Sequence, residues 1–426
     1  MTNEELYLTG IHIEQYRHAT YLPDPYYLEG LRRDPGDSRI NTAYGSLLLS
    51  RGLFRQSEQY FRTAIRRLTW KNPNPYDSEA YYKLGLGLYY QKRYAEAYDA
   101  FYKATWSSEQ QESGFYYLAA IACIQKNYGD ALSFVEKSLV KNGHNVKARG
   151  LKAILLRKLG RSEEAEEWTA ENLKTDPFDF LSATERLSFL KGAEKEKVSR
   201  KRKAVMRDYG ENYLQLARDY AEGGFYEEAC AALNDCADPG AMVKYYLAYY
   251  EGQAGRNEEE VKTLYREAEK ADSYCCFPNK LEDIAVLKDC IGLLPDASYA
   301  PYYLGNLFYD KKQYETAASF WESSAKNHPG FPTVWRNLSL AYYNHLDQPQ
   351  KAKEAIARAF SLDPADSRVF LEMDQLHKKL GYTPAERLAC YEKYKETALE
   401  IPENLLALKS KPQIYKQVIL GSDIKN

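Results

Sequence analysis

The stretch that decides the fold is SEAYYKLGLGLYYQKRYAEAYDAFYKATWSSEQQ (78–111), followed by ESGFYYLAAIACIQKNYGDALSFVEKSLVKNGHN (112–145) and VKARGLKAILLRKLGRSEEAEEWTAENLKTDPFD (146–179). Small residues recur in it every 34 positions, in two series: Gly85, Ala119 and Ala153, and Ala97, Ala131 and Ala165. The two series lie twelve residues apart, which leaves room for two helices per unit. Because small side chains let helix axes approach closely, each small residue is predicted to mark a helix crossing.

The larger residues of the unit support the same interpretation. Phe101 and Val135 follow the small residues and are expected to fill the groove between the helices. Since neither helix of one unit can bury its apolar face alone, neighbouring units must stack into one continuous core. This pattern resembles the tetratricopeptide repeat, a helix-turn-helix unit of 34 residues that ends in proline, and Asp176-Pro177 provides that ending. The resemblance implies an all-α fold, a right-handed α-solenoid.

The register of the repeat divides the chain into six segments. They are an N-terminal helical cap or half repeat (1–37), four repeat units (38–179), a charged helical linker (180–209), two degenerate units with an irregular segment (210–297), three units (298–393) and a C-terminal capping helix (394–426). Within them, Asn72-Pro73-Asn74-Pro75 predicts a loop, because a residue before proline is pushed out of the helical region. Ser182 and Glu185 form a capping-box pattern that predicts the start of a helix. Residues 273–297 fit no unit and are interpreted as a linker or a bend.

A second resemblance rests on longer segments. They are LTGIHIEQYRHATYLPDPYYLEGLRRDPGD (8–37), NPNPYDSEAYYKLGLGLYYQ (72–91), AYDAFYKATW (97–106), YAPYYLGNLFYD (299–310) and VWRNLSLAYYN (334–344). These segments resemble the C-terminal repeat array of large bacterial proteins in which a β-rich domain, similar to galactose-mutarotase-type folds, precedes the array. An association with sugar metabolism is what this resemblance implies.

Composition argues against several classes of partner. Lys and Arg total 58 against 60 for Asp and Glu, a net charge of -2, so no global field attracts nucleic acid or an anionic membrane. The basic run 191–207 is interpreted as a solvated helix face rather than a nucleic-acid patch, because Glu194 and Glu196 interrupt it. The sequence has neither a signal-peptide pattern at its start nor an apolar window long enough to span a bilayer. We therefore expect a cytoplasmic protein that binds neither nucleic acid nor membrane.

No motif in the sequence indicates catalysis. Gly85-Leu-Gly87 lies inside a predicted helix with no strand before it, so it is not a phosphate-binding loop. The seven cysteines include no C-x-x-C pair, and the histidines lack the spacing of helical metal ligands. The carboxylates are spread over a charged helical surface, and no pair of them stands out. The sequence therefore predicts a protein that is not an enzyme and needs no cofactor or metal.

The candidate binding residues follow from the resemblance, because the first helix of each tetratricopeptide unit lines the concave face. The residues at these positions are Tyr82, Tyr89, Tyr116, Tyr302, Asn306, Tyr309, Arg336, Asn337 and Tyr343. Tyrosine combines a flat apolar ring with one hydroxyl, which suits both peptide docking and sugar stacking. The alternative is that these rings only pack between helices. If they serve binding, Tyr82, Tyr89, Tyr302 and Tyr309 should be accessible, and their neighbours Tyr81 and Tyr303 should be buried.

One subfamily of these repeats grips a C-terminal carboxylate with a set of lysines, asparagines and an arginine. Asn306, Asn337 and Arg368 match that pattern, but Tyr302 and Glu372 replace two of its cations, which argues against such a clamp. The leading hypothesis is a non-catalytic scaffold that binds a peptide or protein segment in a tyrosine-rich concave groove. The alternative is an accessory module of a carbohydrate-active protein that binds a glycan or holds a separate β-rich domain.

Overall fold

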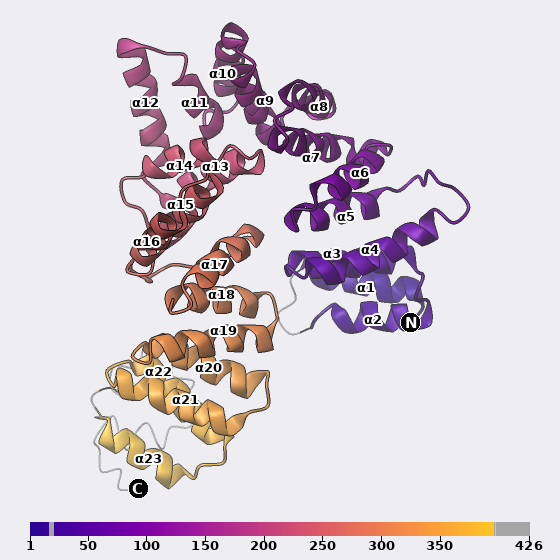
Figure 1. Cartoon of the computed structure of the whole chain (residues 1–426). Coiled ribbons are helices and arrows are strands. Elements are labelled where there is room, and N and C mark those ends of the chain that lie inside the picture. Colours follow the sequence, from indigo (N-terminus) through magenta and orange to yellow (C-terminus); the bar gives the residue numbers. More distant parts are fainter. Residues whose placement is uncertain (17–20, 396, 398–426) are drawn as a thin grey trace. The chain divides into compact units, whose positions relative to one another are not determined.

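The computed structural model describes residues 1–16, 21–395 and 397. Every regular element in these residues is a helix, so the predicted all-α solenoid class is confirmed. The chain forms two compact units, unit 1 (Met1–Asp272) and unit 2 (Ser273–Asn426) (Figure 1). None of the described helices is both long enough and apolar enough to cross a membrane.

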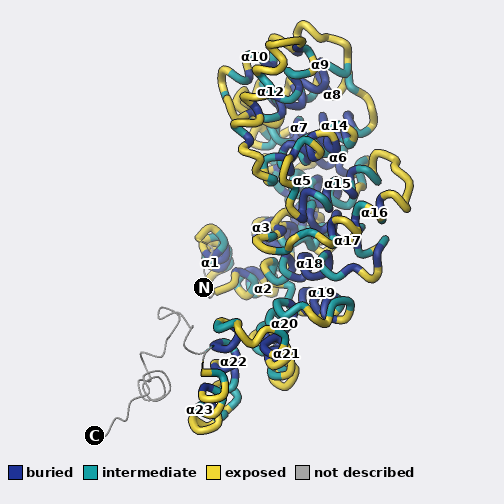
Figure 2. The backbone as a smooth tube through the Cα atoms, turned by 90° about the vertical axis from the view of Figure 1, so that its left-hand side faces the viewer, coloured by how far each residue is buried: buried dark blue, intermediate teal, exposed yellow. Residues whose placement is uncertain are grey.

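Unit 1 is a succession of helices, and almost all of them pack on the next helix along the chain. They are α1 (Asn3–Gln15), α2 (Asp24–Arg33), α3 (Ser38–Ser50), α4 (Phe54–Leu68), α5 (Glu79–Tyr90), α6 (Tyr94–Ala104), the short 3₁₀ turn η1 (Ser108–Gln110), α7 (Gln111–Ile124), α8 (Tyr128–Lys141), α9 (Val146–Lys158), α10 (Ser162–Thr175), α11 (Phe180–Arg186), α12 (Gly192–Met206), α13 (Gly210–Glu222), α14 (Tyr226–Asn234), α15 (Ala241–Gln253) and α16 (Glu258–Ala268). The prolines at 73 and 75 lie in a loop between α4 and α5, as predicted. Figure 2 shows buried and exposed residues alternating along the helices, with further exposed residues at the turns.

Unit 2 continues in the same style. It contains α17 (Leu281–Leu293), α18 (Tyr299–Asp310), α19 (Tyr314–Asn327), α20 (Pro332–Asn344), α21 (Pro349–Leu362), α22 (Ser367–Lys379) and α23 (Pro384–Lys393). The expectation of irregular structure in residues 273–297 was wrong for α17, whose buried Ile284, Leu287 and Cys290 recur at helical spacing. The capping helix predicted at 394–426 lies outside the described residues, apart from positions 394, 395 and 397.

In several helix pairs, the turn depends on one residue with left-handed backbone geometry. Gly52 and Gly160 occupy this position with φ angles of 78° and 74°, which glycine adopts without steric cost. Lys92, Lys126 and Lys312 adopt the same geometry with φ angles of 58°, 61° and 62°. A single left-handed residue closes a helix and reverses the chain within a few residues. The second helix of each pair can therefore return along the first.

The small residues of the repeat lie where the sequence predicted them. A Cβ atom added to Gly85 would lie 2.7 Å from the Phe101 ring, and one added to Gly45 would lie 2.7 Å from the Phe61 ring. In unit 2 the same contact joins Gly305 to the Trp321 ring at 2.4 Å. In each pair, a ring on the second helix fills the space left by a missing side chain on the first. The crossings predicted from the 34-residue period are therefore present in the core.

The regular stacking changes after α10. The predicted capping box was wrong: Asp179, not Ser182, caps α11, and its Oδ1 accepts a hydrogen bond from the Ser182 backbone N–H at 2.9 Å. Glu185 is buried and pairs with Arg157, so it is not available as a capping residue. Helix α11 has only seven residues, and a separate helix, α12, follows it. This interruption shapes the pocket described below.

Candidate functional site

The predicted binding residues are divided between the two units. Tyr82, Tyr89 and Tyr116 lie on α5 and α7 of unit 1. The other six lie on α18 and α20 of unit 2: Tyr302, Asn306, Tyr309, Arg336, Asn337 and Tyr343. The two groups therefore belong to separate units.

In unit 1, the candidate tyrosines of α5 and α7 contact a later part of the same chain. The Tyr89 hydroxyl donates to the backbone carbonyl of Glu222 at 2.6 Å, and the Tyr116 hydroxyl donates to the Glu222 carboxylate at 2.7 Å. The Lys147 ammonium on α9 donates to the same carboxylate at 3.0 Å. Glu222 is the last residue of α13, so these side chains join three successive first helices to α13. Their hydrogen-bonding groups are used within the protein.

The exposure of the tyrosines in unit 1 differs from the prediction. Tyr116 is buried, while Tyr81, Tyr82 and Tyr89 are all half-buried, so the expected contrast between Tyr81 and Tyr82 is absent. Tyr82 and Tyr89 pack against the same ring, that of Tyr117, with centroids at 6.2 and 5.4 Å. Desolvation raises the pKa values of Tyr89 and Tyr116 well above the ordinary range. In this unit the alternative of rings packed between helices describes the tyrosines better.

Asp219, one turn before Glu222 on α13, gives this contact a pH dependence. Its side chain is only 19% exposed, and desolvation raises its pKa from 3.8 to about 6, against the opposing effect of Lys147 at 3.7 Å. A folded pKa above the unfolded one means that the folded state keeps the proton longer, so stability is lost as the pH rises from about 4 to about 6. Two pKa units at about 1.4 kcal/mol each correspond to about 3 kcal/mol, so we expect Asp219→Asn to be more stable than the wild type by about that amount at pH 7, and to differ little from it at pH 4. Urea unfolding at both pH values measures this, and an equal difference at the two pH values would contradict it.

In unit 2, a hydrogen-bonded chain of side chains crosses three successive first helices. It begins at Asn306 of α18, whose Oδ1 accepts from the Trp321 indole N–H and from the Asn337 amide N–H of α20, both at 3.1 Å. It continues along α20, where Arg336 donates to the Asn337 Oδ1 at 3.3 Å. Asn306, Arg336 and Asn337 are half-buried, so each keeps some contact with solvent. The predicted polar residues of this unit are therefore brought together.

The chain of contacts ends on α22 at a carboxylate that the prediction did not place in the site. Arg336 makes two parallel bonds to Glu372, from Nε at 2.6 Å and from Nη2 at 2.5 Å. Arg368 approaches the same carboxylate at 3.4 Å and is largely exposed. In the sequence, Glu372 stands out only because it replaces one of the cations of the carboxylate-binding pattern. Its spacing of four from Arg368 on one helix was the signal that could have identified it as a partner.

The aromatic residues of unit 2 meet the prediction in part. Tyr303 is buried, as expected, but Tyr302 is also buried at 8% exposure, so the accessibility predicted for it was wrong. The Phe331 ring packs edge-on against Tyr302 at 4.8 Å and covers it. Tyr309 is half-buried beside the Trp321 ring at 5.3 Å. Tyr343 is half-buried, and the Lys379 ammonium lies 5.1 Å from its ring centre.

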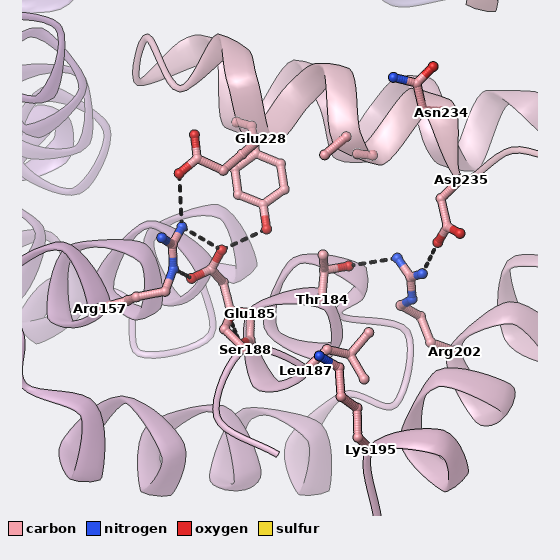
Figure 3. A pocket seen from close by; sticks show the side chains of 13 residues that line it. Arg157, Thr184, Glu185, Leu187, Ser188, Lys195, Arg202, Glu228, Asn234 and Asp235 are labelled. Carbon is pink, nitrogen blue, oxygen red and sulfur yellow. Dashed lines mark hydrogen bonds and ion pairs between the residues drawn. The ribbon is translucent and has the colours of Figure 1, made fainter. Parts of the chain in front are cut away.

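A pocket of about 560 Å³ lies in unit 1, where α9 and α11 to α14 meet (Figure 3). At one end, Arg157 pairs with Glu185 at 2.6 Å and with Glu228 at 3.1 Å, and the Tyr220 hydroxyl donates to Glu185 at 2.7 Å. Lys158 adds a second contact to Glu228 at 2.6 Å. Both carboxylates at this end are therefore paired with cations.

The other end of the pocket is formed by α12 and the end of α14. Arg202 donates to the Thr184 hydroxyl at 3.1 Å and to the Asp235 carboxylate. Figure 3 shows Lys195 extending from α12 into the space between these two ends. Lys195 and Arg202 belong to the basic run that was interpreted as a solvated face. That interpretation was wrong for Arg202, which is buried.

Comparison with known proteins gives a family match for part of the chain. Residues 42–110 match the tetratricopeptide repeat family. A tetratricopeptide repeat protein from Parabacteroides merdae is 14% identical over 68% of this chain and 98% of that chain, with a TM-score of 0.41. MamA 41-end from Desulfovibrio magneticus is 20% identical over 44% and 94% of the two chains (TM-score 0.27), and the structure of Naa15/Naa10 bound to HypK-THB is 15% identical over 98% and 67% (TM-score 0.30). The family match at residues 42–110, which span most of α3 to α6, supports a tetratricopeptide-repeat protein.

Proposed function

We propose that this chain is a protein-interaction scaffold and that one face of unit 2, formed by α18, α20 and α22, binds a peptide segment of a partner. The observation that carries the proposal is the hydrogen-bonded chain from Asn306 through Asn337 and Arg336 to Glu372. It crosses three stacked helices with side chains that are only half-buried. Stacked repeats commonly bind extended segments along such a surface.

The side chains of Asn306 and Asn337 are oriented by hydrogen bonds before any peptide backbone binds. The Asn306 oxygen already accepts two hydrogen bonds, which fixes the orientation of its amide. One N–H of that amide faces the Tyr302 hydroxyl, and the other is left as a donor. The Asn337 amide donates one N–H to Asn306 and has a second N–H that can donate to a ligand. Because these side chains are ordered before binding, little conformational entropy is lost when a peptide carbonyl takes their hydrogen bonds.

The charges on this face favour an acidic segment. Two guanidinium groups, Arg336 and Arg368, share the single carboxylate of Glu372, so the cluster carries a net positive charge. Complementary charge increases the rate of encounter and selects among partners more than it adds affinity. We therefore expect a partner segment with Asp or Glu near its centre rather than one recognised by its terminal carboxylate.

We predict that Asn306→Asp weakens the binding of such a segment by about tenfold. An aspartate can still accept the bonds from Trp321 and Asn337, so the fold is retained, but it removes the amide donor and adds a repelling charge. Peptides selected by display against the full chain are then measured by calorimetry against the wild type and the variant.

Asn344→Asp is the matched control, because Asn344 is exposed at the end of α20 and the substitution changes charge by the same amount. It should leave the affinity unchanged. Equal weakening by the two variants would show that only the overall charge matters. A glycan array in parallel tests the other class of ligand, and binding to glycans with no peptide selected would overturn the proposal.

A further inference from the structure

The pocket of unit 1 lies at the point where the repeat is interrupted. Helix α11 is only seven residues long and α12 follows it as an extra helix, so the regular alternation of two helices per repeat is not kept here. The resulting space of about 560 Å³ is within the size range of small-molecule sites. It belongs to unit 1 and does not depend on the peptide face proposed for unit 2.

The lining near α12 carries more positive than negative charge. Lys195 and Arg202 line the pocket, and Lys203 contacts the Asp235 carboxylate at 3.1 Å. Asp235 is therefore shared by Arg202 and Lys203, which leaves no carboxylate at this end for Lys195. Lys195 is exposed, and no ion pair joins it to any residue that the structure describes. An anionic ligand would complete the charge balance here.

Arg202 gives a second, independent indication of a ligand. Arg202 is only 6% exposed, and its two terminal nitrogens donate hydrogen bonds to Thr184 and Asp235. Its Nε, which is itself screened from solvent, has no acceptor among the described residues. Buried donors are nearly always paired, so an unpaired one next to a polar cavity marks a position where an acceptor is favoured. Lys195 and Arg202 are seven residues apart on α12 and so lie on the same face of the helix.

We propose that this pocket binds a small carboxylate, with Lys195 as its charge anchor and Arg202 as its hydrogen-bond donor. One carboxylate oxygen pairs with the Lys195 ammonium, and a small turn of the Arg202 side chain toward the cavity gives its Nε–H the other oxygen as an acceptor. Two donors match the two oxygens of a carboxylate, whereas a phosphate would leave oxygens unpaired beside the three carboxylates of the lining. The carboxylate belongs either to a free small acid or to an acidic side chain of a peptide.

Calorimetry on the full chain at constant ionic strength tests the proposal with three probes: glutarate, the capped peptide acetyl-Glu-Glu-amide and inorganic phosphate. We expect Lys195→Gln to lower the affinity for whichever of the two carboxylate probes binds more tightly by about fivefold. Lys197→Gln is the matched control, because Lys197 is exposed on α12 and points away from Lys195 by about 200° around the helix. It should leave the affinity unchanged.

The outcomes separate the alternatives. Tighter binding of glutarate than of the peptide identifies a free acid as the ligand, and the reverse identifies an acidic side chain. The proposal would be overturned if both lysine variants weakened binding equally, or if phosphate bound more tightly than the carboxylate probes. It would also be overturned if no probe bound more tightly than chloride. The ¹⁵N–¹H signal of the Arg202 Nε–H, assigned from the spectrum of Arg202→Lys, must also shift on binding. An unchanged signal would remove Arg202 from the site and overturn the assignment.

Discussion

Replacing Asp374 with alanine should lower the free energy of unfolding of the region around α22 and α23 by about 3 to 5 kcal/mol. Asp374 and Arg387 pair across these two helices with side chains only 7% and 5% exposed, and their Oδ1 and Nε atoms are 2.6 Å apart. The Tyr391 hydroxyl donates to the same carboxylate at 3.1 Å. Removal of the carboxylate leaves a guanidinium charge buried without a partner. Hydrogen exchange of α22 and α23, together with urea unfolding of the full chain, measures the loss.

Two further variants make this expectation specific. Asp310→Ala removes an aspartate that is 73% exposed in the same unit, and its effect should stay within about 0.5 kcal/mol. The double variant Asp374→Leu/Arg387→Met removes both charges, and it should recover much of the lost stability because apolar side chains can replace a buried ion pair. If the double variant were less stable than Asp374→Ala, the stability would come from the ion pair itself. The unpaired charge of Arg387 would then not explain the loss.

The second large effect is expected at the helix crossings of unit 1. Gly85→Leu and Ala119→Leu should each destabilise unit 1 by about 1 to 3 kcal/mol through overpacking. Even a single added carbon at Gly85 would meet the Phe101 ring at 2.7 Å, and Ala119 is completely buried. Thermal unfolding of the full chain measures both variants.

Gly129→Leu is the control for this experiment. Gly129 lies in α8, and a Cβ atom added there meets nothing within 4 Å. Leucine also has a higher helix propensity than glycine, so this variant should melt at the wild-type temperature or above it. If Gly85→Leu melted unchanged as well, the close contact between Gly85 and Phe101 would not limit the packing of these helices.

The part of the fold that could be predicted depends on local spacing. A small residue and the ring that fills its place lie sixteen positions apart, as at Gly85 and Phe101, so one repeat unit contains the whole contact. The period of 34 residues therefore revealed these crossings without any knowledge of distant parts of the chain. Residues 281–293 were missed because their helix does not carry the small-residue markers that identified the other units.

The site was harder to predict because its partners are distant in sequence. The repeat register gives positions on the first helices, but nothing near Tyr89 or Tyr116 in the sequence indicates that Glu222 contacts them. Arg202 was misjudged for a related reason. A basic run with glutamates among its residues has the composition of a solvated face, and burial of one arginine depends on where α14 ends.

The contact between Glu222 and the tyrosines of α5 and α7 has a consequence for how unit 1 folds. Most contacts in a repeat array join neighbouring helices, so such chains have low contact order and can assemble from any unit outward. The bonds from Tyr89 and Tyr116 to Glu222 instead span 133 and 106 positions. They can form only after the intervening helices are in place, which puts them late on the folding pathway. Once formed, they couple the opening of α5 and α7 to that of α13, so this stretch is less free to unfold one repeat at a time.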